Sequence, residues 1–567
     1  MLRSRWALWA GILVFPPLGL VLWWIRRGVR PLARIAGTLG ICAVAVVELF
    51  FVYGMRLEWN GALSVQGVSF ETRAQRDKRL EASRARQHLE APPSAPPPAA
   101  PPVETAPAAV TPAPARNIAY VPPAYWTDFR GPNRAGIYAE SEIETTWPQA
   151  GLPRLWKQPV GGGYASFTVA EGRAYTIEQR RDHEAITAYD VETGRELWAF
   201  SYPALFDEIM GGAGPRATPV YREGLLYSLG ANGDLYCLSA KTGQPKWSKN
   251  VLADNAARNQ EWGMAASPLI VDGMVVVTPG GAQGKSIVAY DRLSGAPVWR
   301  ALDDRAGYTS PILATLAGRR QIVWLSAQRA VGLAPETGAL LREYAFPAQN
   351  DMNCSQPVVV DESSVLLSSS PGPGAVLLEI GTAGETCTAR ALWRNNRMKN
   401  KFNSSVLYQG FIYGFDDAIL ACIDARTGEL KWKGGRYGYG QLLQAGEHLV
   451  VVTEQGDVVL VRATPEGHRE LARFSAIEGR TWNIPAIDDG LLLVRNSNEM
   501  ACFRLGPSLA SRKTDRVLLF APHPHEEHAR HDQEKPEELH AGKRLLEEDA
   551  RPQQRPDVAQ RYHRVQH

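Results

Sequence analysis

Cysteine is scarce in this sequence and carries none of the usual motifs. The 567 residues include six cysteines, and no two of them are adjacent or form a CxxC pair. This spacing excludes a CxxCH haem attachment site and the usual zinc patterns. We interpret Cys237, Cys422 and Cys502 as small core residues because their strand-like contexts are similar. A disulfide between Cys354 and Cys387 is left open.

An excess of one charge is also lacking. The chain has 62 basic and 59 acidic residues and a net charge of +3, which gives no support for nucleic acid or another strongly charged partner. The sequence shows no nucleophile elbow or metal-ligand pair that would indicate a hydrolase or lyase. What it does have is 16 tryptophans and 51 glycines, which favour many short strands joined by tight turns.

Two apolar runs at the N-terminus, within residues 1–58, predict two transmembrane helices. The runs are Trp6–Ile25 and Ile35–Met55, each about 20 residues long and so long enough to cross a bilayer. Pro16 and Pro17 are expected to kink the first helix. The arginine-rich loop between the runs belongs in the cytoplasm by the positive-inside rule, which places everything after residue 56 outside. A cleaved signal peptide is the alternative.

Composition divides the rest of the chain into four parts. Residues 59–91 are charged and favour a juxtamembrane helix or linker, and residues 92–125 are rich in proline and alanine. At about 3.1 Å per residue, this second stretch is interpreted as a polyproline II spacer with a reach on the order of 70 Å, which would hold the globular part well clear of the membrane. Residues 126–506 are globular. Residues 507–567 hold seven of the eleven histidines, and we interpret them as a disordered charged tail, with weak metal binding as the alternative.

The globular part contains a repeat of the form A-x-D-x-x-T-G-x-x-x-W. Its clear copies are AYDVETGRELW (188–198), CLSAKTGQPKW (237–247), AYDRLSGAPVW (289–299) and CIDARTGELKW (422–432). The aspartate and glycine of each copy are expected to shape a turn, and the tryptophan to bury its ring against a neighbouring unit. The residues given this structural role are Asp190, Gly194, Trp198, Gly243, Trp247, Asp291, Gly295, Trp299, Asp424, Gly428 and Trp432.

The repeat interval predicts the fold. Turn glycines recur about every 40–50 residues, with one double-length gap, and each unit holds several short strands, which indicates a β-propeller. Counting units gives eight blades, which begin near Phe167, Ala217, Ala266, Ser310, Ser355, Ser404, Leu442 and Pro485. The last unit lacks a fourth strand. We therefore predict that the upstream segment PRLWKQPV, which contains Trp156, completes it and closes the ring.

The repeat resembles that of the quinoprotein alcohol and glucose dehydrogenases over about residues 126–505, and equally that of non-catalytic PQQ-like propellers such as the outer-membrane assembly lipoprotein BamB. The resemblance implies an all-β, eight-bladed propeller of the quinoprotein type. The family's enzymes use an adjacent Cys-Cys disulfide, a Glu/Asn/Asp set that holds calcium against the quinone, and an aspartate base. This chain has no Cys-Cys pair, and neither the calcium set nor the base can be placed. It also lacks the lipobox cysteine that anchors BamB.

Function in a propeller is expected at the loops that lead into the innermost strands, around the central channel. Here these loops are polar and aromatic, as in NQEWGMAASP (259–268) and GRTWNIP (479–485). Such walls suit a planar acidic ligand or a peptide, although ordinary loop polarity explains the same residues. The residues expected to ring one mouth of the channel are Arg216, Glu261, Trp262, Tyr308, Asn353, Lys401, Asn403, Tyr439, Trp482 and Asn483.

These observations favour a membrane-anchored, non-catalytic propeller that acts as an interaction scaffold or ligand-binding module. Its expected partners are the membrane and a protein or peptide, and its expected location is a bacterial inner membrane with the propeller in the periplasm. The alternative is a PQQ-dependent dehydrogenase that oxidises alcohols or sugars. We assign no catalytic residue, metal site or cofactor, and leave PQQ with calcium open.

Overall fold

The computed structural model describes residues 16–26, 28–51, 55–62, 64–90, 125–384 and 386–507. Three expectations fall largely outside these residues: the first part of the first apolar run, the proline-rich stretch and the histidine-containing tail.

The N-terminal part forms a helical hairpin. Helix α2 covers Pro16–Ile25 and α3 covers Pro31–Phe51, four residues earlier than expected. The two helices are joined by a hydrogen bond of 3.1 Å from Trp23 Nε1 to the carbonyl oxygen of Arg34. Within the described residues, α3 alone is long and apolar enough to cross a membrane. A second span therefore stays a prediction.

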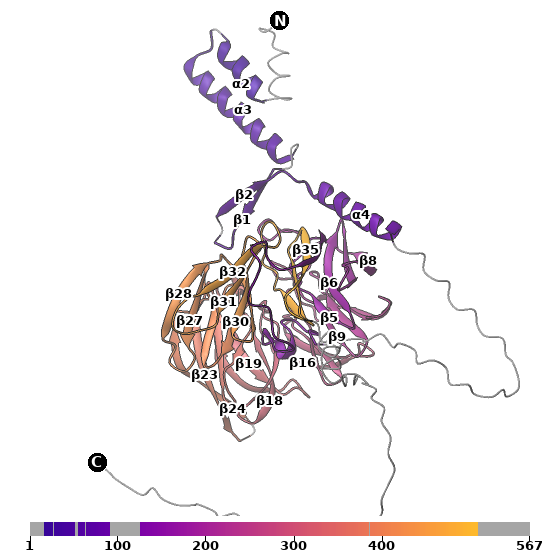
Figure 1. The fold of residues 1–567 in the computed structure, drawn as a ribbon, viewed down its shortest axis with the longest axis vertical. Coiled ribbons are helices and arrows are strands. Elements are labelled where there is room, and N and C mark those ends of the chain that lie inside the picture. The colour runs from indigo at the N-terminus through magenta and orange to yellow at the C-terminus, as the bar shows by residue number, and fades with distance from the viewer. Residues whose placement is uncertain are drawn as a thin grey trace, which may run out of the picture. The chain divides into compact units, whose positions relative to one another are not determined.

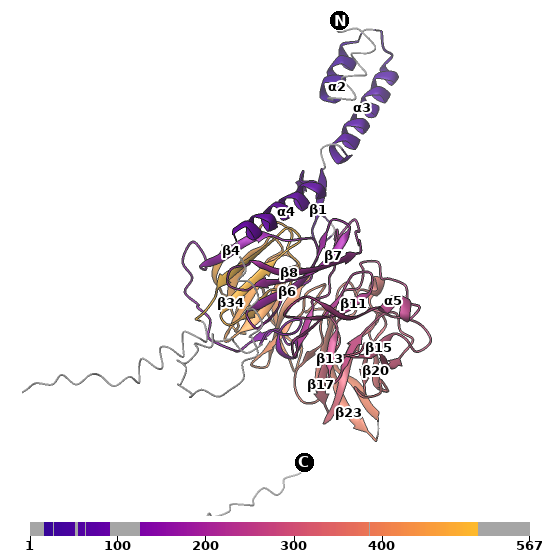
Figure 2. The ribbon, with the colours of Figure 1, turned by 90° about the vertical axis from the view of Figure 1, so that its right-hand side faces the viewer.

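A short β-hairpin and a charged helix follow. Strands β1 (Arg56–Trp59) and β2 (Val65–Ser69) pair in antiparallel fashion, and α4 covers Arg73–Glu90. Helix α4 runs along the propeller near β4 and β8 (Figures 1 and 2). The guanidinium of Arg84 in α4 donates two hydrogen bonds of 3.0 Å, one to the side-chain oxygen of Gln158 and one to the carbonyl oxygen of Pro159.

These contacts change the interpretation of the proline-rich stretch 92–125. It was expected to hold the propeller clear of the membrane. However, α4 precedes it and already contacts the propeller, also through an ion pair of 2.5 Å between Arg181 and Glu81. The stretch therefore connects two segments that both adjoin the propeller, so its reach does not set the distance between α3 and the propeller.

Eight antiparallel sheets in the described part of the chain form the blades of the propeller, as the repeat predicted. They follow one another in chain order, from magenta to yellow in Figure 1. The first blade has β5 (Thr168–Ala170), β6 (Arg173–Arg180), β7 (His183–Asp190) and β8 (Glu196–Pro203), and the second has β9 (Val220–Arg222), β10 (Leu225–Leu229), β11 (Asp234–Ser239) and β12 (Pro245–Asn250). The third blade has β13 (Leu269–Val271), β14 (Met274–Val277), β15 (Ile287–Asp291) and β16 (Pro297–Ala301). The fourth blade has β17 (Ile312–Leu316), β18 (Arg319–Leu325), β19 (Arg329–Leu333) and β20 (Leu340–Ala345).

The other four blades follow the same order, and every blade begins within a few residues of its expected start. The fifth blade has β21 (Val358–Val359), β22 (Ser364–Ser369), β23 (Gly374–Ala383) and β24 (Thr386–Asn395), and the sixth has β25 (Val406–Tyr408), β26 (Phe411–Asp416), β27 (Ile419–Asp424) and β28 (Leu430–Arg436). The seventh blade has β29 (Gln441–Ala445), β30 (His448–Val452), β31 (Asp457–Arg462) and β32 (Glu470–Ser475), with β3 (Ile137–Tyr138) parallel to β29. The eighth blade has β33 (Ala486–Asp488), β34 (Leu491–Arg495) and β35 (Glu499–Arg504). The short helices are η1 (Pro132–Arg134), α5 (Val251–Asp254) and η2 (Gln349–Asp351).

The last blade closes as predicted. Its fourth strand is β4 (Arg154–Pro159), which pairs in antiparallel fashion with β35 and places Trp156 opposite Cys502. Without β4, the blade would present an unpaired edge to solvent.

The repeated tryptophan joins six of the eight blades to the blade that follows. Trp156 donates its indole N–H to the carbonyl oxygen of Val191 at 2.9 Å, and Trp198 donates to Ala240 at 3.1 Å. Each ring lies on the turn glycine of the next blade: a Cβ at Gly194 would meet Trp156 at 2.6 Å, and one at Gly243 would meet Trp198 at 2.5 Å. The predicted burial against the neighbouring blade is confirmed. The same indole contact to the next turn recurs at Trp247, Trp299, Trp393 and Trp432.

Four of the six cysteines are buried, and none of the six is paired. All six are free and lie within the described residues. Cys237, Cys422 and Cys502 are fully buried on middle strands, as expected. The Cys354–Cys387 disulfide that the sequence left open is not formed.

Candidate functional site

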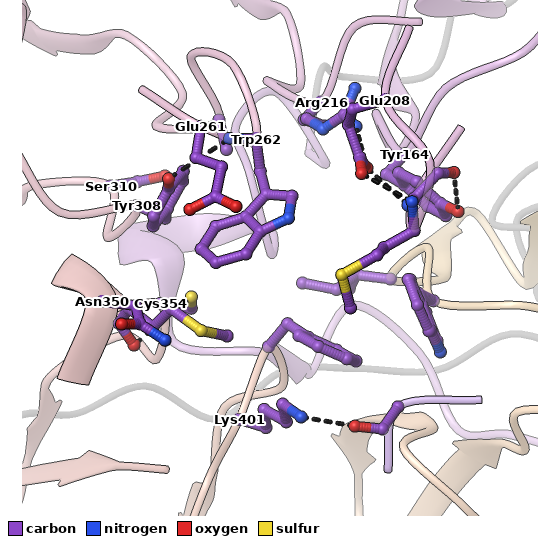
Figure 3. Close-up of a pocket in the computed structure, with 18 of the residues that line it drawn as sticks. Tyr164, Glu208, Arg216, Glu261, Trp262, Tyr308, Ser310, Asn350, Cys354 and Lys401 are labelled. Atoms are coloured by element: carbon purple, nitrogen blue, oxygen red, sulfur yellow. Dashed lines mark hydrogen bonds and ion pairs between the residues drawn. The ribbon is translucent and has the colours of Figure 1, made fainter. Parts of the chain in front are cut away.

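The loops that lead into the inner strands surround a cavity of about 530 Å³ at one mouth of the channel. Figure 3 shows the labelled side chains converging on this space from several blades. We call this cavity the mouth pocket. It is lined by Gly61, Phe129, Tyr164, Glu208, Met210, Gly211, Arg216, Glu261, Trp262, Ala265, Tyr308, Ser310, Asn350, Met352, Cys354, Pro371, Lys401, Phe402, Trp482 and Ile484.

The floor of the mouth pocket is a segment that crosses the propeller axis. Phe129 lines the pocket, and the residues that follow it reach opposite sides of the ring. Arg134 donates to the carbonyl oxygen of Ser267 at 3.2 Å, before β13 in the third blade. The carbonyl oxygen of Gly136 accepts from the N–H of Gln444 at 2.8 Å, on β29 in the seventh blade. A segment that bonds to both sides of a ring must cross its centre, so the pocket is a cup rather than an open channel.

The walls are aromatic and in contact with one another. The rings of Trp262 and Tyr308 are 5.7 Å apart between centroids, and those of Tyr164 and Trp482 are 5.4 Å apart. Phe402 continues the wall, 4.6 Å from Trp482. Rings in such tilted arrangements gain attraction beyond the area they bury, which makes the wall rigid.

Arg216 is a positive group at the wall that already has partners. It pairs with Glu208 at 3.1 Å and donates to the carbonyl oxygen of Gly212 at 3.2 Å. Its guanidinium also lies 4.6 Å from the centre of the Phe206 ring. Burial lowers the pKa of Arg216. It therefore organises the loop that contains residues 208–216.

Arg480 and Lys401 are the other cations beside the mouth pocket. Arg480 stacks on Trp482 at 4.3 Å and donates to the carbonyl oxygens of Met210 at 2.7 Å and Gly211 at 2.9 Å. Burial lowers the pKa of Lys401, which donates to the carbonyl oxygen of a residue outside the propeller. The dashed line from Lys401 in Figure 3 marks this bond.

That residue is Gly61, at the tip of the β1–β2 hairpin. Its N–H donates to Glu454 Oε1 at 2.7 Å, and its carbonyl oxygen accepts from Lys401. The tip lies against the ring of Tyr439. The mouth pocket therefore already contacts a polypeptide turn of this chain.

The structure brings together seven of the ten residues expected at the mouth. Six of them line the pocket: Arg216, Glu261, Trp262, Tyr308, Lys401 and Trp482. Tyr439 lies beneath the Gly61 tip, with Lys401 5.2 Å from its ring centre.

The other three expected residues are asparagines that lie behind the pocket lining. Asn353, Asn403 and Asn483 are almost completely buried and do not line the pocket. Their amide groups donate to backbone carbonyls: Asn353 to Ser326 at 2.7 Å, Asn403 to Gly440 at 3.2 Å and Asn483 to Ala165 at 2.9 Å. They hold neighbouring loops together through these amide N–H groups.

Sequence reasoning missed the floor and the tip. Phe129 and its arginines occur in DFRGPNRAG (128–136), a run with two glycines and two arginines between two aromatic-containing segments, which was the available signal. Tyr164 precedes the first inner strand, in a loop equivalent to the channel-mouth loops of the other blades. Gly61 gave no signal, because nothing local to it points to the propeller.

The residues at the mouth do not fit a calcium-bound quinone, the cofactor that the fold family implies. Within the described residues, no three His, Cys, Asp or Glu side chains converge as a metal site. The carboxylate of Glu208 is engaged by Arg216, and that of Glu454 accepts from Gly61 and from Trp482 at 2.8 Å. Glu261 is the other carboxylate that lines the pocket, and one carboxylate falls short of the about six to eight oxygen ligands that calcium takes.

Comparisons with known proteins agree with the propeller architecture. Residues 181–434 match the family model described as outer membrane protein assembly factor BamB. The quinohemoprotein alcohol dehydrogenase ADH-IIG of Pseudomonas putida is 30% identical over 161 residues, which cover 27% of this chain and 21% of that enzyme. The matched region thus spans about a fifth of that relative.

Solved structures of both kinds of protein are similar at low sequence identity. BamB from Moraxella catarrhalis has a TM-score of 0.46 and 15% identity, covering 63% of this chain and 98% of BamB. The quinohemoprotein alcohol dehydrogenase from Comamonas testosteroni has a TM-score of 0.49 and 14% identity, covering 68% of this chain and 81% of the enzyme.

Proposed function

We propose that this chain, a PQQ-like repeat β-propeller protein, is a non-catalytic module that binds a polypeptide segment of a partner protein in its mouth pocket. The observation that carries the proposal is the Gly61 tip, a polypeptide turn held by side chains of the propeller. The aromatic and methionine side chains around it supply apolar area, which is what a bound segment needs beyond main-chain hydrogen bonds.

We further propose that the propeller is anchored by α3 in a bacterial inner membrane and faces the periplasm. The apolar length of α3 and the arginines before it support this orientation. A cysteine introduced at Lys241, an exposed turn residue, should react with a membrane-impermeant thiol reagent in intact spheroplasts. Labelling only after lysis would contradict the orientation.

Site-specific photo-crosslinking in living cells tests the binding proposal. A benzophenone amino acid is placed at Asn350, which is exposed and lines the mouth pocket. The control position is Arg390, which is exposed on the outer strand β24, away from the mouth. We expect discrete protein adducts at position 350 that are absent at 390 and weakened by Trp262→Ala. Equal adducts at both positions, or none at 350, would refute the proposal.

The alternative is a PQQ-dependent dehydrogenase for alcohols or sugars, which the 161-residue similarity to a quinohemoprotein alcohol dehydrogenase favours. The full-length protein is mixed with PQQ and calcium, and the quinone absorbance and dye reduction with alcohols or sugars are followed. Micromolar PQQ binding with turnover would replace the binding-module proposal.

A further inference from the structure

We propose that the mouth pocket recognises a glycine-containing polypeptide turn, and that the tip of the β1–β2 hairpin, residues 60–62, occupies this site in cis until a partner's turn displaces it. The inference rests on the proposed function, because it names the element of the partner that is recognised.

The propeller contacts the tip through the main chain. Glu454 accepts the N–H of Gly61 at 2.7 Å, and Lys401 donates to the carbonyl oxygen of the same residue. Gly61 is buried, while its neighbour Ala62 is exposed. Both backbone polar groups of Gly61 are thus satisfied by charged side chains, which form stronger hydrogen bonds than neutral ones. Recognition of this kind depends on backbone shape and accepts a turn from another chain.

The contact admits only glycine. A Cβ at Gly61 would lie 2.3 Å from Cδ2 and 2.4 Å from Cγ of Tyr439, well inside van der Waals contact. The Tyr439 ring is 8% exposed and packs 5.8 Å from Phe402, so it has little space to move away. Gly61 is not among the residues with positive φ. Close approach, and not an unusual backbone conformation, therefore requires glycine here.

Side chains and backbone of the propeller itself orient the two charged groups. The second carboxylate oxygen of Glu454 accepts the N–H of Tyr439 at 3.2 Å, and the first also accepts the indole N–H of Trp482 at 2.8 Å. Lys401 lies 5.2 Å from the centre of the Tyr439 ring and 5.6 Å from that of Phe402. A site whose groups are already oriented loses little conformational entropy when a turn binds.

The tip itself is suited to release. The side chain of Asn60 accepts from the N–H groups of Ala62 and Ser64 at 3.0 Å each, which shapes the turn without help from the propeller. The two strands behind it are short, and an isolated two-stranded hairpin is marginally stable. A partner whose turn is backed by a larger interface would displace the tip, provided that it overcomes the high local concentration of a tethered segment, typically millimolar.

The test uses the full-length protein in lipid nanodiscs and a fluorescent peptide that carries residues 56–69 of this sequence, cyclised to hold the turn. In wild-type protein the tip blocks the pocket. In the Gly61→Val variant we expect the peptide to bind about ten- to a hundredfold more tightly, since the cis competitor is lost. The matched control is Ala62→Val, one residue along the same tip but exposed, which should bind like wild type.

A second comparison tests whether Lys401 and Glu454 bind the main chain of the turn. Adding Lys401→Met to Gly61→Val should weaken peptide binding about tenfold, because the carbonyl of the bound turn loses its donor. A peptide with valine at the position of Gly61 should not bind. Hydrogen exchange at residue 61 should also be faster in Gly61→Val than in wild type and in Ala62→Val.

Three outcomes overturn the inference: no peptide binding by Gly61→Val, equal binding by Ala62→Val, or unchanged exchange at residue 61. The result is separable from the proposed function. Peptide binding without adducts at position 350 in cells would refute the proposal of a partner protein but support occupancy of the site by the tip. Adducts without peptide binding would refute recognition of a glycine turn but support the proposal of a partner protein.

Discussion

Trp156→Ala should open the ring at its seam. Trp156 lies on β4, the strand that completes the last blade, and only 9% of its surface is exposed. Its indole N–H donates to Val191 at 2.9 Å, in the first blade, and its ring lies on Gly194 of the same turn. Trp156 therefore bridges the last blade and the first, together with Arg495 of β34, which donates to Thr176 of β6 at 2.6 Å.

The expected loss follows from the buried area. A buried tryptophan removes about 150–250 Å² from water, which at about 25 cal/mol per Å² amounts to roughly 4–6 kcal/mol. Measured tryptophan-to-alanine losses are about 3–5 kcal/mol, because part of the cavity collapses, and the lost hydrogen bond adds about 1 kcal/mol. We expect the free energy of unfolding to fall by about 4 kcal/mol. Trp156→Phe should cost only about 1–2 kcal/mol, since most of the ring remains.

Urea unfolding followed by fluorescence measures these losses, and limited proteolysis locates them. The matched control is Trp247→Ala, which removes the same motif residue, with its 3.0 Å bond to Arg292, from an interior pair of blades. Trp156→Ala should expose cleavage sites next to β4 and β35, and Trp247→Ala should not. A loss below about 1 kcal/mol, the size seen for exposed positions, would refute the assignment of Trp156 as the seam residue.

Three further changes probe the pH response, the α4 contact and the floor of the pocket. Burial raises the pKa of Asp488 to about 8. The folded carboxyl thus keeps a proton that the unfolded chain releases near pH 4, so the melting temperature should fall as the pH rises from about 4 to 8. Asp488→Asn should flatten this pH dependence. Asp291→Asn, which changes a carboxyl at an exposed turn, should leave it unchanged. Arg84→Ala removes an ion pair of 3.2 Å with the largely buried Glu196 and should cost about 1–3 kcal/mol, with faster hydrogen exchange along α4; unchanged exchange would contradict the α4 contact. Arg134→Met removes the bonds that bridge the blades at the axis and should cost about 3–5 kcal/mol in urea unfolding; a neutral result would contradict the role of this segment as the floor.

Most of the fold could be predicted because one sequence motif recurs in several blades. Asp190, Gly194 and Trp198 recur as a set, and a repeated set points to a repeated unit. Even so, the sequence explained Gly194 only by its turn. The structure adds a second reason: Trp156 of the preceding blade occupies the space of the missing side chain.

The site could be predicted only in part, because it depends on segments without repeats. Polar loops indicated where the mouth would be, but polarity alone does not separate a side chain that faces a cavity from one that bonds to the backbone. Asn403 and Asn483 both stand three residues before an inner strand. A residue type that recurs at the same position in different blades indicates a structural role, as it does for the repeated tryptophans. Gly61 meets Lys401 only through tertiary structure, which no local pattern reports.

The closure by β4 also sets the order in which the molecule can be completed. β4 ends at Pro159 and its partner β35 begins at Glu499, so the strand that is made first must wait for the one made last. At about 5–20 residues per second, synthesis of the roughly 340 residues between them takes on the order of 20–70 s. During that interval β4 has no sheet to join, and the growing stack of blades keeps an open edge. Ring closure is therefore a late, long-range step, and a chain that stops short of β35 is left with the edge strands that favour aggregation.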